Sequence, residues 1–152
     1  MQTTCIKPKI SIGMPVYYGE RLIRTTIDSL LSQTFSNFEL IISDNASTDS
    51  TSQICEEYQA KDPRIKYFKQ SENKGALYNF SFVLEQSKSE YFMWAAHDDC
   101  WDKRFIETIL EKFDKSNDDI IAIASEAQYT INFDKQPRSE ERRVGKECVS
   151  EC

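Results

Sequence analysis

The sequence is poor in several residue types, and each shortage excludes a class of protein. Its 152 residues include only four glycines, four prolines and one histidine. These counts exclude a collagen-like or low-complexity chain and argue against a small fold dominated by loops. No apolar run approaches the roughly 18 residues that a membrane span requires. Residues 1–8 also lack the apolar stretch of a secretory signal. We therefore expect a cytoplasmic protein without a membrane span in this chain, with peripheral attachment at the cytoplasmic membrane face left open.

Positive charge is also scarce. There are 19 Lys and Arg residues against 25 Asp and Glu, for a formal net charge of −6. Nucleic-acid binding needs a basic surface that displaces phosphate counterions, so we expect no nucleic-acid partner. A nucleotide ligand remains compatible, because a divalent cation can bridge carboxylates and phosphates. The five cysteines have no CxxC spacing and are interpreted as reduced thiols rather than as a zinc site.

Apolar, β-branched runs alternate with segments of helical periodicity along the chain. This alternation predicts a doubly wound, mostly parallel α/β sheet with right-handed crossovers. In such sheets ligands bind beyond the carboxyl ends of the strands. The predicted strands are residues 9–17, 38–44, 65–68, 91–96 and 120–124, and the predicted helices are 20–32, 50–60, 76–86 and 103–114. The strand-end rule then selects residues 15–18, 44–47, 70–75 and 96–99 as one candidate site.

The end of the sequence departs from this rhythm. Residues 139–152 are half charged and contain two aliphatic side chains. Residues 138–148 look like the translation of a common sequencing adapter. We therefore interpret residues 1–136 as the domain and residues 137–152 as a non-native or disordered tail. A solvated C-terminal helix turn is the alternative.

Two adjacent carboxylates, Asp98 and Asp99, follow the fourth predicted strand. Such neighbours repel each other unless a cation or a donor lies beside them. Their oxygen ligands suit Mg²⁺ or Mn²⁺. The alternative is that one of them caps the helix that begins near Lys103. Their place at the carboxyl end of a strand favours the metal.

Polar and aromatic residues follow the first three predicted strands. Asp44 after the second strand can accept the imide N–H of a pyrimidine base, whereas turn and capping chemistry explains Ser47–Asp49 better than Asp44. Tyr17 and Tyr18 can stack on a base or pack at a rim. Asn73-Lys74-Gly75 can line a diphosphate or form a plain turn. No GxGxxG follows the first strand, which argues against a dinucleotide-binding dehydrogenase.

Together these segments resemble glycosyltransferase family 2. The resemblance covers about residues 7–133 and rests on five ordered motifs: 15–20, 27–35, 44–49, 73–75 with Asn79, and 96–99. It implies the GT-A fold, in which a Rossmann-like nucleotide half is joined to an acceptor half. It also implies transfer of a sugar from a nucleotide diphosphate to a hydroxyl, typically with inversion and with Mg²⁺ or Mn²⁺. We expect UDP or dTDP as the donor nucleotide, and a glycan or lipid-linked glycan of a cell envelope polysaccharide as the acceptor.

The resemblance also assigns roles to single residues. Pro15, Val16 and Tyr17 would frame the base, Glu20 would lie near the entrance, and Asp44 would accept the imide proton. Asp98 would bind the metal with Asp99 beside it. The expected nucleotide-binding residues are Pro15, Val16, Tyr17, Glu20, Asp44, Asn73, Lys74, His97 and Asp98, and the expected metal ligands are Asp98 and Asp99.

Four departures from the family pattern matter. Ala96 stands at the first acidic position of the metal motif, so His97 either supplies a replacement contact or acts as a spacer. Tyr18 stands where Asn is common, and Asn45 replaces a second Asp. No acceptor half with a carboxylate base follows Ala124, so the general base is expected beyond the chain end. A non-catalytic module or fragment that binds sugar nucleotides is therefore the alternative to an active transferase.

Overall fold

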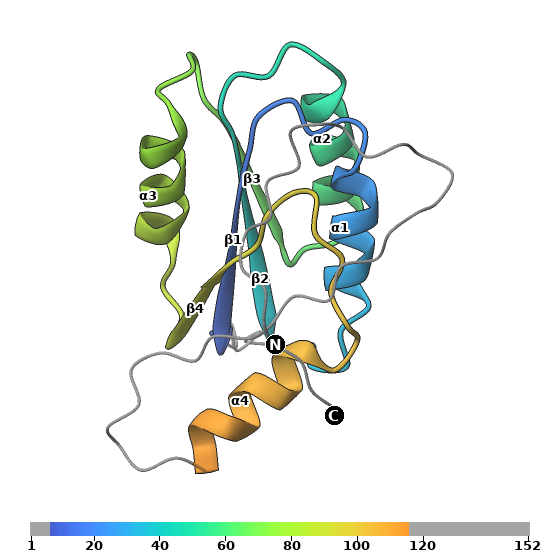
Figure 1. The fold of residues 1–152 in the computed structure, drawn as a ribbon, viewed down its shortest axis with the longest axis vertical. Helices are drawn as coiled ribbons and strands as arrows, with labels where there is room; N and C mark the ends of the chain where they lie inside the picture. The colour runs from blue at the N-terminus through green and yellow to red at the C-terminus, as the bar shows by residue number, and fades with distance from the viewer. Residues whose placement is uncertain (1–6, 116–152) are drawn as a thin grey trace, which may run out of the picture. The chain divides into compact units, whose positions relative to one another are not determined.

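A computed structural model describes residues 7–115 of the chain. Strands and helices alternate through these residues, as the sequence predicts, and Figure 1 labels each of them. The predicted strand at 120–124 and the tail lie outside the described residues. The elements are β1 (Ile10–Val16), α1 (Ile23–Leu31), β2 (Phe38–Asp44), α2 (Thr51–Lys61), β3 (Ile65–Lys69), α3 (Ala76–Gln86), β4 (Tyr91–Trp94) and α4 (Phe105–Lys115).

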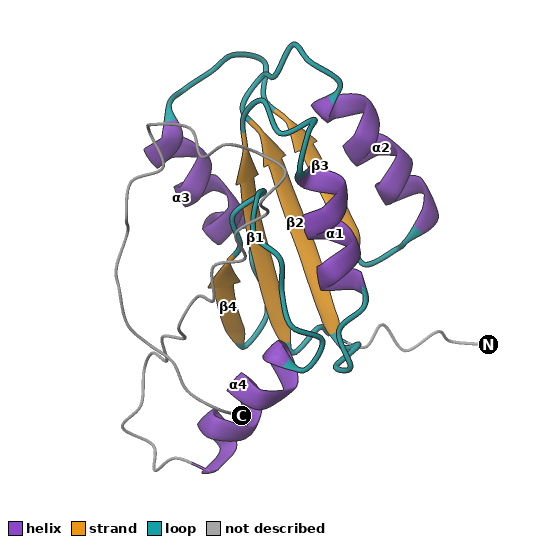
Figure 2. Ribbon diagram, turned by 45° about the vertical axis from the view of Figure 1, so that its right-hand side comes forward, coloured by secondary structure: helices purple, strands orange, loops and turns teal. Residues whose placement is uncertain are grey.

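The four described strands form one parallel sheet in the order β3-β2-β1-β4. Figure 2 shows that all four arrows point the same way, so the carboxyl ends share one edge. The register aligns those ends: Val16 lies opposite Asp44, and Asp44 lies opposite Lys69. Because β1 is central, the loops after β1, β2 and β4 meet at this edge. The parallel α/β prediction is confirmed.

Helices cover both faces of the sheet. Figure 1 shows α1 and α2 on one side and α3 on the other. Side chains alternate along a strand, so Ile12 and Met14 of β1 pack in the main core with Ile27 of α1. On the α3 face, Gly13 has no room for a side chain, since an added Cβ would lie 2.6 Å from the Phe92 ring. The residues of β1 that face α3 are therefore small, which brings α3 close to the sheet.

A polar cluster joins three strands near their amino ends. Glu39 of β2 is buried, and its carboxylate accepts hydrogen bonds from the Ser11 hydroxyl at 2.5 Å and from the Lys66 ammonium. Burial raises the pKa of Glu39, but the hydrogen bonds from Lys66 and Ser11 outweigh it and hold the pKa below the usual range. The carboxylate is therefore charged and satisfied at neutral pH.

Several element ends differ from the predicted bounds by one to three residues, and two of them show the cause. Helix α1 begins at Ile23 instead of Glu20, because the carbonyl of Gly19 first accepts the N–H groups of Leu22 and Ile23 in a turn. Strand β4 ends at Trp94, although the Ala95 N–H still donates to the Gly13 carbonyl at 2.9 Å. Between residues 7 and 115, no helix has both the length and the apolar character needed to cross a membrane.

Candidate functional site

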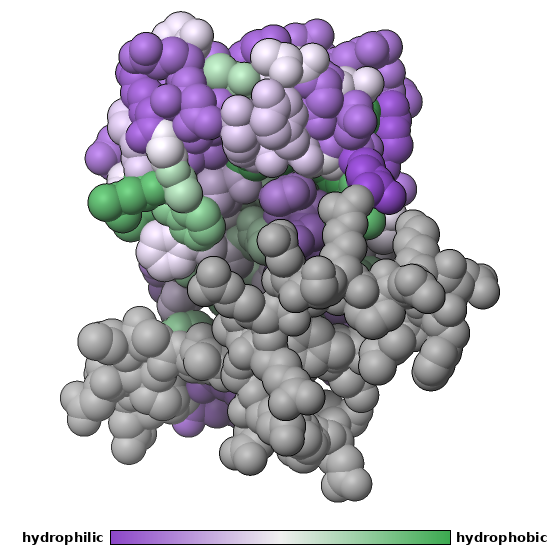
Figure 3. All heavy atoms as spheres, turned by 45° about the horizontal axis from the view of Figure 1, so that its top comes forward, coloured by the Kyte–Doolittle hydropathy of each residue, from purple (hydrophilic) through white to green (hydrophobic). Residues whose placement is uncertain are grey.

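A cavity of about 440 Å³ lies at the carboxyl edge of the sheet. The four segments that the strand-end rule selected from the sequence all contribute to its wall. Figure 3, which turns this end of the molecule toward the viewer, shows a mostly hydrophilic surface with apolar side chains at the margin on the α3 side. The lining residues are Pro15, Val16, Tyr17, Asn45, Asn73, Gly75, Ala76, Asn79, Phe80, Ala96, His97 and Asp98.

Most of the residues predicted for nucleotide binding meet in this cavity. The predicted residues that line it are Pro15, Val16, Tyr17, Asn73, His97 and Asp98. Four others do not line it: Asp44, Lys74 and Asp99, which are adjacent in sequence to lining residues, and Glu20. The residues predicted for the site thus gather largely at one cavity, and their roles in binding stay predictions.

Asp44 is adjacent to the cavity residue Asn45 but does not line the cavity itself. The residue is fully buried, and its Oδ1 accepts the Ser47 N–H at 2.8 Å. Its Oδ2 accepts the hydroxyls of Ser52 at 2.8 Å and Tyr67 at 3.0 Å. Contact with a bound base would require these bonds to exchange, so the base-reading role of Asp44 stays a prediction.

The neighbouring Asn45 reaches the cavity instead. Its Nδ2 donates to Asn73 Oδ1 at 2.8 Å, and its Oδ1 accepts the Lys74 N–H at 3.0 Å. Asn45 therefore fixes the turn at residues 73–75, for which the sequence analysis gave it no role. Alternation along the strand is the signal that finds it: Asp44 shares a face with Leu40 and Ile42, and the next residue points to the opposite face.

Two tyrosines follow β1: Tyr17 lines the cavity, and the Tyr18 ring packs beside it at the rim. Tyr17 is 41% exposed and Tyr18 is 50% exposed, with their ring centroids 4.2 Å apart. Tyr18 has a φ of 55°, its N–H donates to Ser47 Oγ at 3.0 Å, and its hydroxyl lies 3.1 Å from Thr48 Oγ1. Both rings thus remain outside the core and offer aromatic surface to a ligand.

Glu20 joins two loops. Its carboxylate accepts the Ser50 N–H at 3.0 Å, and its own N–H donates to Asp49 Oδ2 at 3.3 Å. Between them, the Gly19 N–H donates to Thr51 Oγ1 at 2.9 Å. These hydrogen bonds therefore hold the loop after β1 against the start of α2, and the Glu20 carboxylate takes part in them.

Asp98 and Asp99 lie in the loop after β4, and Asp98 lines the cavity. Partial burial and, second, the charge of Asp98 raise the pKa of Asp99. Within residues 7–115 there is no group of three or more His, Cys, Asp or Glu side chains placed to hold a metal. Two carboxylates still fit Mg²⁺ or Mn²⁺, since such ions are commonly held by one or two carboxylates together with substrate phosphates.

The capping alternative for the carboxylate pair is not what the structure shows. The N–H of Arg104 near the start of α4 donates to Asp102 Oδ1 at 2.8 Å, so a different aspartate caps this helix. The loop is also held from α1, where the Thr26 hydroxyl donates to the His97 carbonyl at 2.8 Å. The His97 ring packs near Gly19, where an added Cβ would lie 3.1 Å from it. The loop is fixed at both ends, which leaves Asp98 free to face a ligand.

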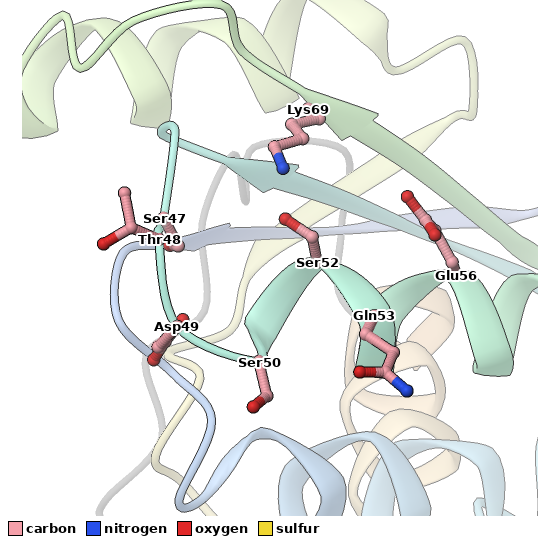
Figure 4. Close-up of a pocket in the computed structure, with 8 residues that line it drawn as sticks. All are labelled: Ser47, Thr48, Asp49, Ser50, Ser52, Gln53, Glu56 and Lys69. Carbon is pink, nitrogen blue, oxygen red and sulfur yellow. The ribbon is translucent and has the colours of Figure 1, made fainter.

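A second hollow of about 660 Å³ lies between the loop after β2, the start of α2 and Lys69 of β3. Figure 4 shows the Lys69 side chain pointing toward Ser52, with Asp49 and Glu56 also at the hollow. It is larger and more open than the first cavity, and the negative charges of Asp49 and Glu56 would repel a phosphate. The chemistry expected of a nucleotide site is therefore better met in the first cavity.

Comparison with known proteins identifies the family. The family model of glycosyl transferase family 2 matches residues 11–148. A glycosyltransferase of Rickettsia typhi is 38% identical over 124 residues, which are 80% of this chain and 37% of that protein. TuaG of Bacillus subtilis, named for teichuronic acid biosynthesis, is 35% identical over 69% of this chain and 42% of its own length. The chain therefore spans well under half of these relatives.

Solved structures agree with this assignment. Staphylococcus aureus TarS, solved in complex with UDP-GlcNAc, matches with a TM-score of 0.66 and 29% identity over 70% of this chain and 31% of that chain. A mannosyltransferase from Pyrobaculum calidifontis matches with a TM-score of 0.59 and 20% identity over 65% of this chain and 30% of its own, which shows a common fold. The family match and these structures together show that the chain belongs to glycosyltransferase family 2 and has the GT-A fold.

Proposed function

We propose that the chain is the donor-binding part of a metal-dependent, inverting glycosyltransferase, with a UDP-sugar or dTDP-sugar as the donor. The observation that carries the proposal is the convergence of four strand-end loops on one cavity, with Tyr17 at its rim and Asp98 in its wall. The solved TarS complex with UDP-GlcNAc supports a uridine donor. The acceptor is a hydroxyl of a glycan or lipid-linked glycan, which the name of TuaG supports.

The residues divide the donor among them. The exposed ring of Tyr17 stacks on the base, with Pro15 and Val16 behind it. The turn at 73–75, held by Asn45, lies toward the diphosphate with the Lys74 ammonium near it. Asp98 and Asp99 would hold Mg²⁺ or Mn²⁺, which would supply neutralisation of charge on the diphosphate leaving group. His97 supports the loop after β4 and Glu20 supports the loop after β1, and the nucleotide lies between these two loops.

Inverting transfer also needs a carboxylate to deprotonate the acceptor hydroxyl. No residue between 7 and 115 is assigned this role, and this chain covers 37% of the Rickettsia typhi relative. The second candidate function follows from that coverage: a sugar-nucleotide-binding module that does not transfer. An assay of donor hydrolysis and of transfer to hydroxyl acceptors separates the two, since a module binds UDP-sugar without releasing UDP.

The location of the site has its own test. Titration of UDP and Mg²⁺ into ¹⁵N-labelled protein, followed by NMR, should shift the amide signals of residues 15–18, 45, 73–76 and 96–98. Mg²⁺ is the suitable ion here because Mn²⁺ is paramagnetic and broadens nearby signals. Shifts confined to residues 47–56 and Lys69 would place the nucleotide in the second hollow and contradict the proposal.

A further inference from the structure

We infer that Asp44 is a positioning residue, whose buried carboxylate holds the aromatic rim of the cavity in shape through Ser47 without contacting the base. The inference rests on the proposed function, because the rim matters only where a nucleotide binds. It gives Asp44 a different role from the base reading expected from the sequence. The two roles predict different behaviour for two small substitutions.

The Asp44 side chain points into the core under α1 and α2. Asp44 is the last residue of β2 and is fully buried. It shares the face of Leu40 and Ile42, which belong to the main core under α1 and α2. Asn45 and Asn79 line the cavity, and Asp44 does not. A strand reverses its side-chain direction at every residue, so the Asp44 carboxylate is directed to the face opposite that of Asn45.

Hydrogen bonds hold the Asp44 carboxylate in this position. Three donors surround it: the Ser47 N–H at 2.8 Å, the Ser52 hydroxyl at 2.8 Å and the Tyr67 hydroxyl at 3.0 Å. A buried carboxylate without donors is costly, and these three satisfy it. Turning it toward a base would break bonds on α2 and β3 at once. Its partners therefore hold it in place whether or not a ligand is bound.

A chain of contacts links Asp44 to the rim of the cavity. Asp44 Oδ1 fixes the N–H of Ser47, and Ser47 Oγ in turn accepts the N–H of Tyr18 at 3.0 Å. Tyr18 has a φ of 55° and Ala46 a φ of 62°. They are the two non-glycine residues with positive φ in the part of the chain that the structure describes. Such conformations persist only where the surroundings hold them, and both residues lie within this chain of contacts.

The test compares two variants for binding of UDP and CDP with Mn²⁺, by calorimetry on protein shown to be folded. Ser47→Ala leaves the carboxylate in place and removes the acceptor of the Tyr18 N–H. Asp44→Asn keeps the shape and weakens the hold on Ser47. Positioning predicts that each variant weakens UDP and CDP by the same factor, about tenfold, which corresponds to about 1.4 kcal/mol. The ratio of the UDP and CDP affinities should stay within about twofold of the wild-type ratio.

Two control variants at exposed positions outside this network test whether a substitution as such affects binding. Ser32→Ala changes an exposed serine at the end of α1. Asp28→Asn changes an exposed aspartate that accepts the Tyr58 hydroxyl at 2.7 Å. Neither of these two should alter nucleotide binding.

Two results would overturn the inference. The first is a Ser47→Ala variant that binds both nucleotides normally. The second is an Asp44→Asn variant whose UDP to CDP ratio changes severalfold, as direct base reading requires. If Asp44→Asn does not fold, Ser47→Ala decides alone. Failure of the proposed function is a separate result, because then the wild-type protein binds neither nucleotide.

Discussion

Asp98 is the single residue on which the proposed metal site depends most. It lines the cavity, and its charge contributes to the raised pKa of Asp99. Asp98→Asn removes one negative charge from the pair of carboxylates, so we expect UDP binding in the presence of Mn²⁺ to weaken at least tenfold, or by about 1.4 kcal/mol. Stability without ligand should hold or rise, because a like-charge neighbour is relieved. Calorimetry and thermal melting measure the two effects, with Asp28→Asn as the control. Normal binding by the variant would show that the metal assignment is wrong.

The same scale shows what a sequence can and cannot predict about a site. The sequence located Pro15, Tyr17 and Asp98 in one cavity, because the carboxyl ends of parallel strands must meet at one edge. The sequence did not show which of Asp44 and Asn45 faces the cavity, because the order of the motifs does not say toward which face of the sheet a side chain points. Alternation along β2 supplies that direction once the strand is in register. The bonds from Asn45 to residues 73–75 span about thirty positions and leave no local pattern.

At the scale of elements, the turn before α3 depends on Gly75. This residue has φ 85° and ψ 166°, a conformation accessible almost only to glycine. An added Cβ would meet no atom within 4 Å, so Gly75→Ala tests backbone strain alone. We expect the free energy of unfolding to fall by about 1–3 kcal/mol, measured by urea denaturation. Ser81→Ala, at an exposed position of α3, should change it by less than about 0.5 kcal/mol. Equal stability of Gly75→Ala and wild type would mean that this turn adopts another conformation.

The polar cluster around Glu39 predicts a pH dependence. Its pKa is lower in the folded chain than the value of about 4.3 for an unperturbed Glu. The bonded carboxylate therefore contributes stability above that value, and the contribution is lost as the pH falls through the folded pKa. Glu39→Gln should cost about 1–3 kcal/mol at pH 7. The two proteins should converge in stability as the pH falls below the unperturbed value and through the lowered folded pKa, where wild-type Glu39 becomes protonated.

Urea unfolding at several pH values measures this difference. The matched control is Glu57→Gln, since Glu57 forms an exposed ion pair with Arg24 and such pairs contribute little. A constant difference between wild type and Glu39→Gln across the whole pH range would show that the charge of Glu39 does not stabilise the fold.

The helices and strands also show where local patterns suffice. Helix α3 has the predicted bounds, 76–86, because its apolar spacing and the glycine before it are both local signals. The start of α1 was predicted three residues too early, since the turn at Gly19 is set by contacts with Thr51 and Val16. The anchor of α4 on Gln33, whose Oε1 accepts the Ile106 N–H at 3.0 Å, is likewise a long-range contact. Periodicity thus predicts what an element is, and tertiary contacts decide where it ends.

At the scale of the whole molecule, the assignment of residues 137–152 to a tail outside the domain stays a prediction. Residues 139–152 are half charged and bury little apolar area if they behave as their composition suggests. Their deletion should leave the melting temperature within about 2 °C of the full chain. The family model extends to residue 148, so the deletion measures directly whether this segment belongs to the domain. A fall of more than about 5 °C would show that it packs on the domain.

The central claim is that the cavity at the carboxyl edge of the sheet binds a nucleotide diphosphate with a divalent cation. Calorimetric titration of UDP into the wild-type chain, once with Mn²⁺ and once with EDTA, tests it most directly. We expect one saturable site with Mn²⁺ and at least tenfold weaker binding with EDTA. Absence of binding heat in both titrations, in protein whose thermal melt shows it to be folded, would contradict nucleotide binding at this cavity. Binding of equal strength in both would contradict the role given to Asp98 and Asp99.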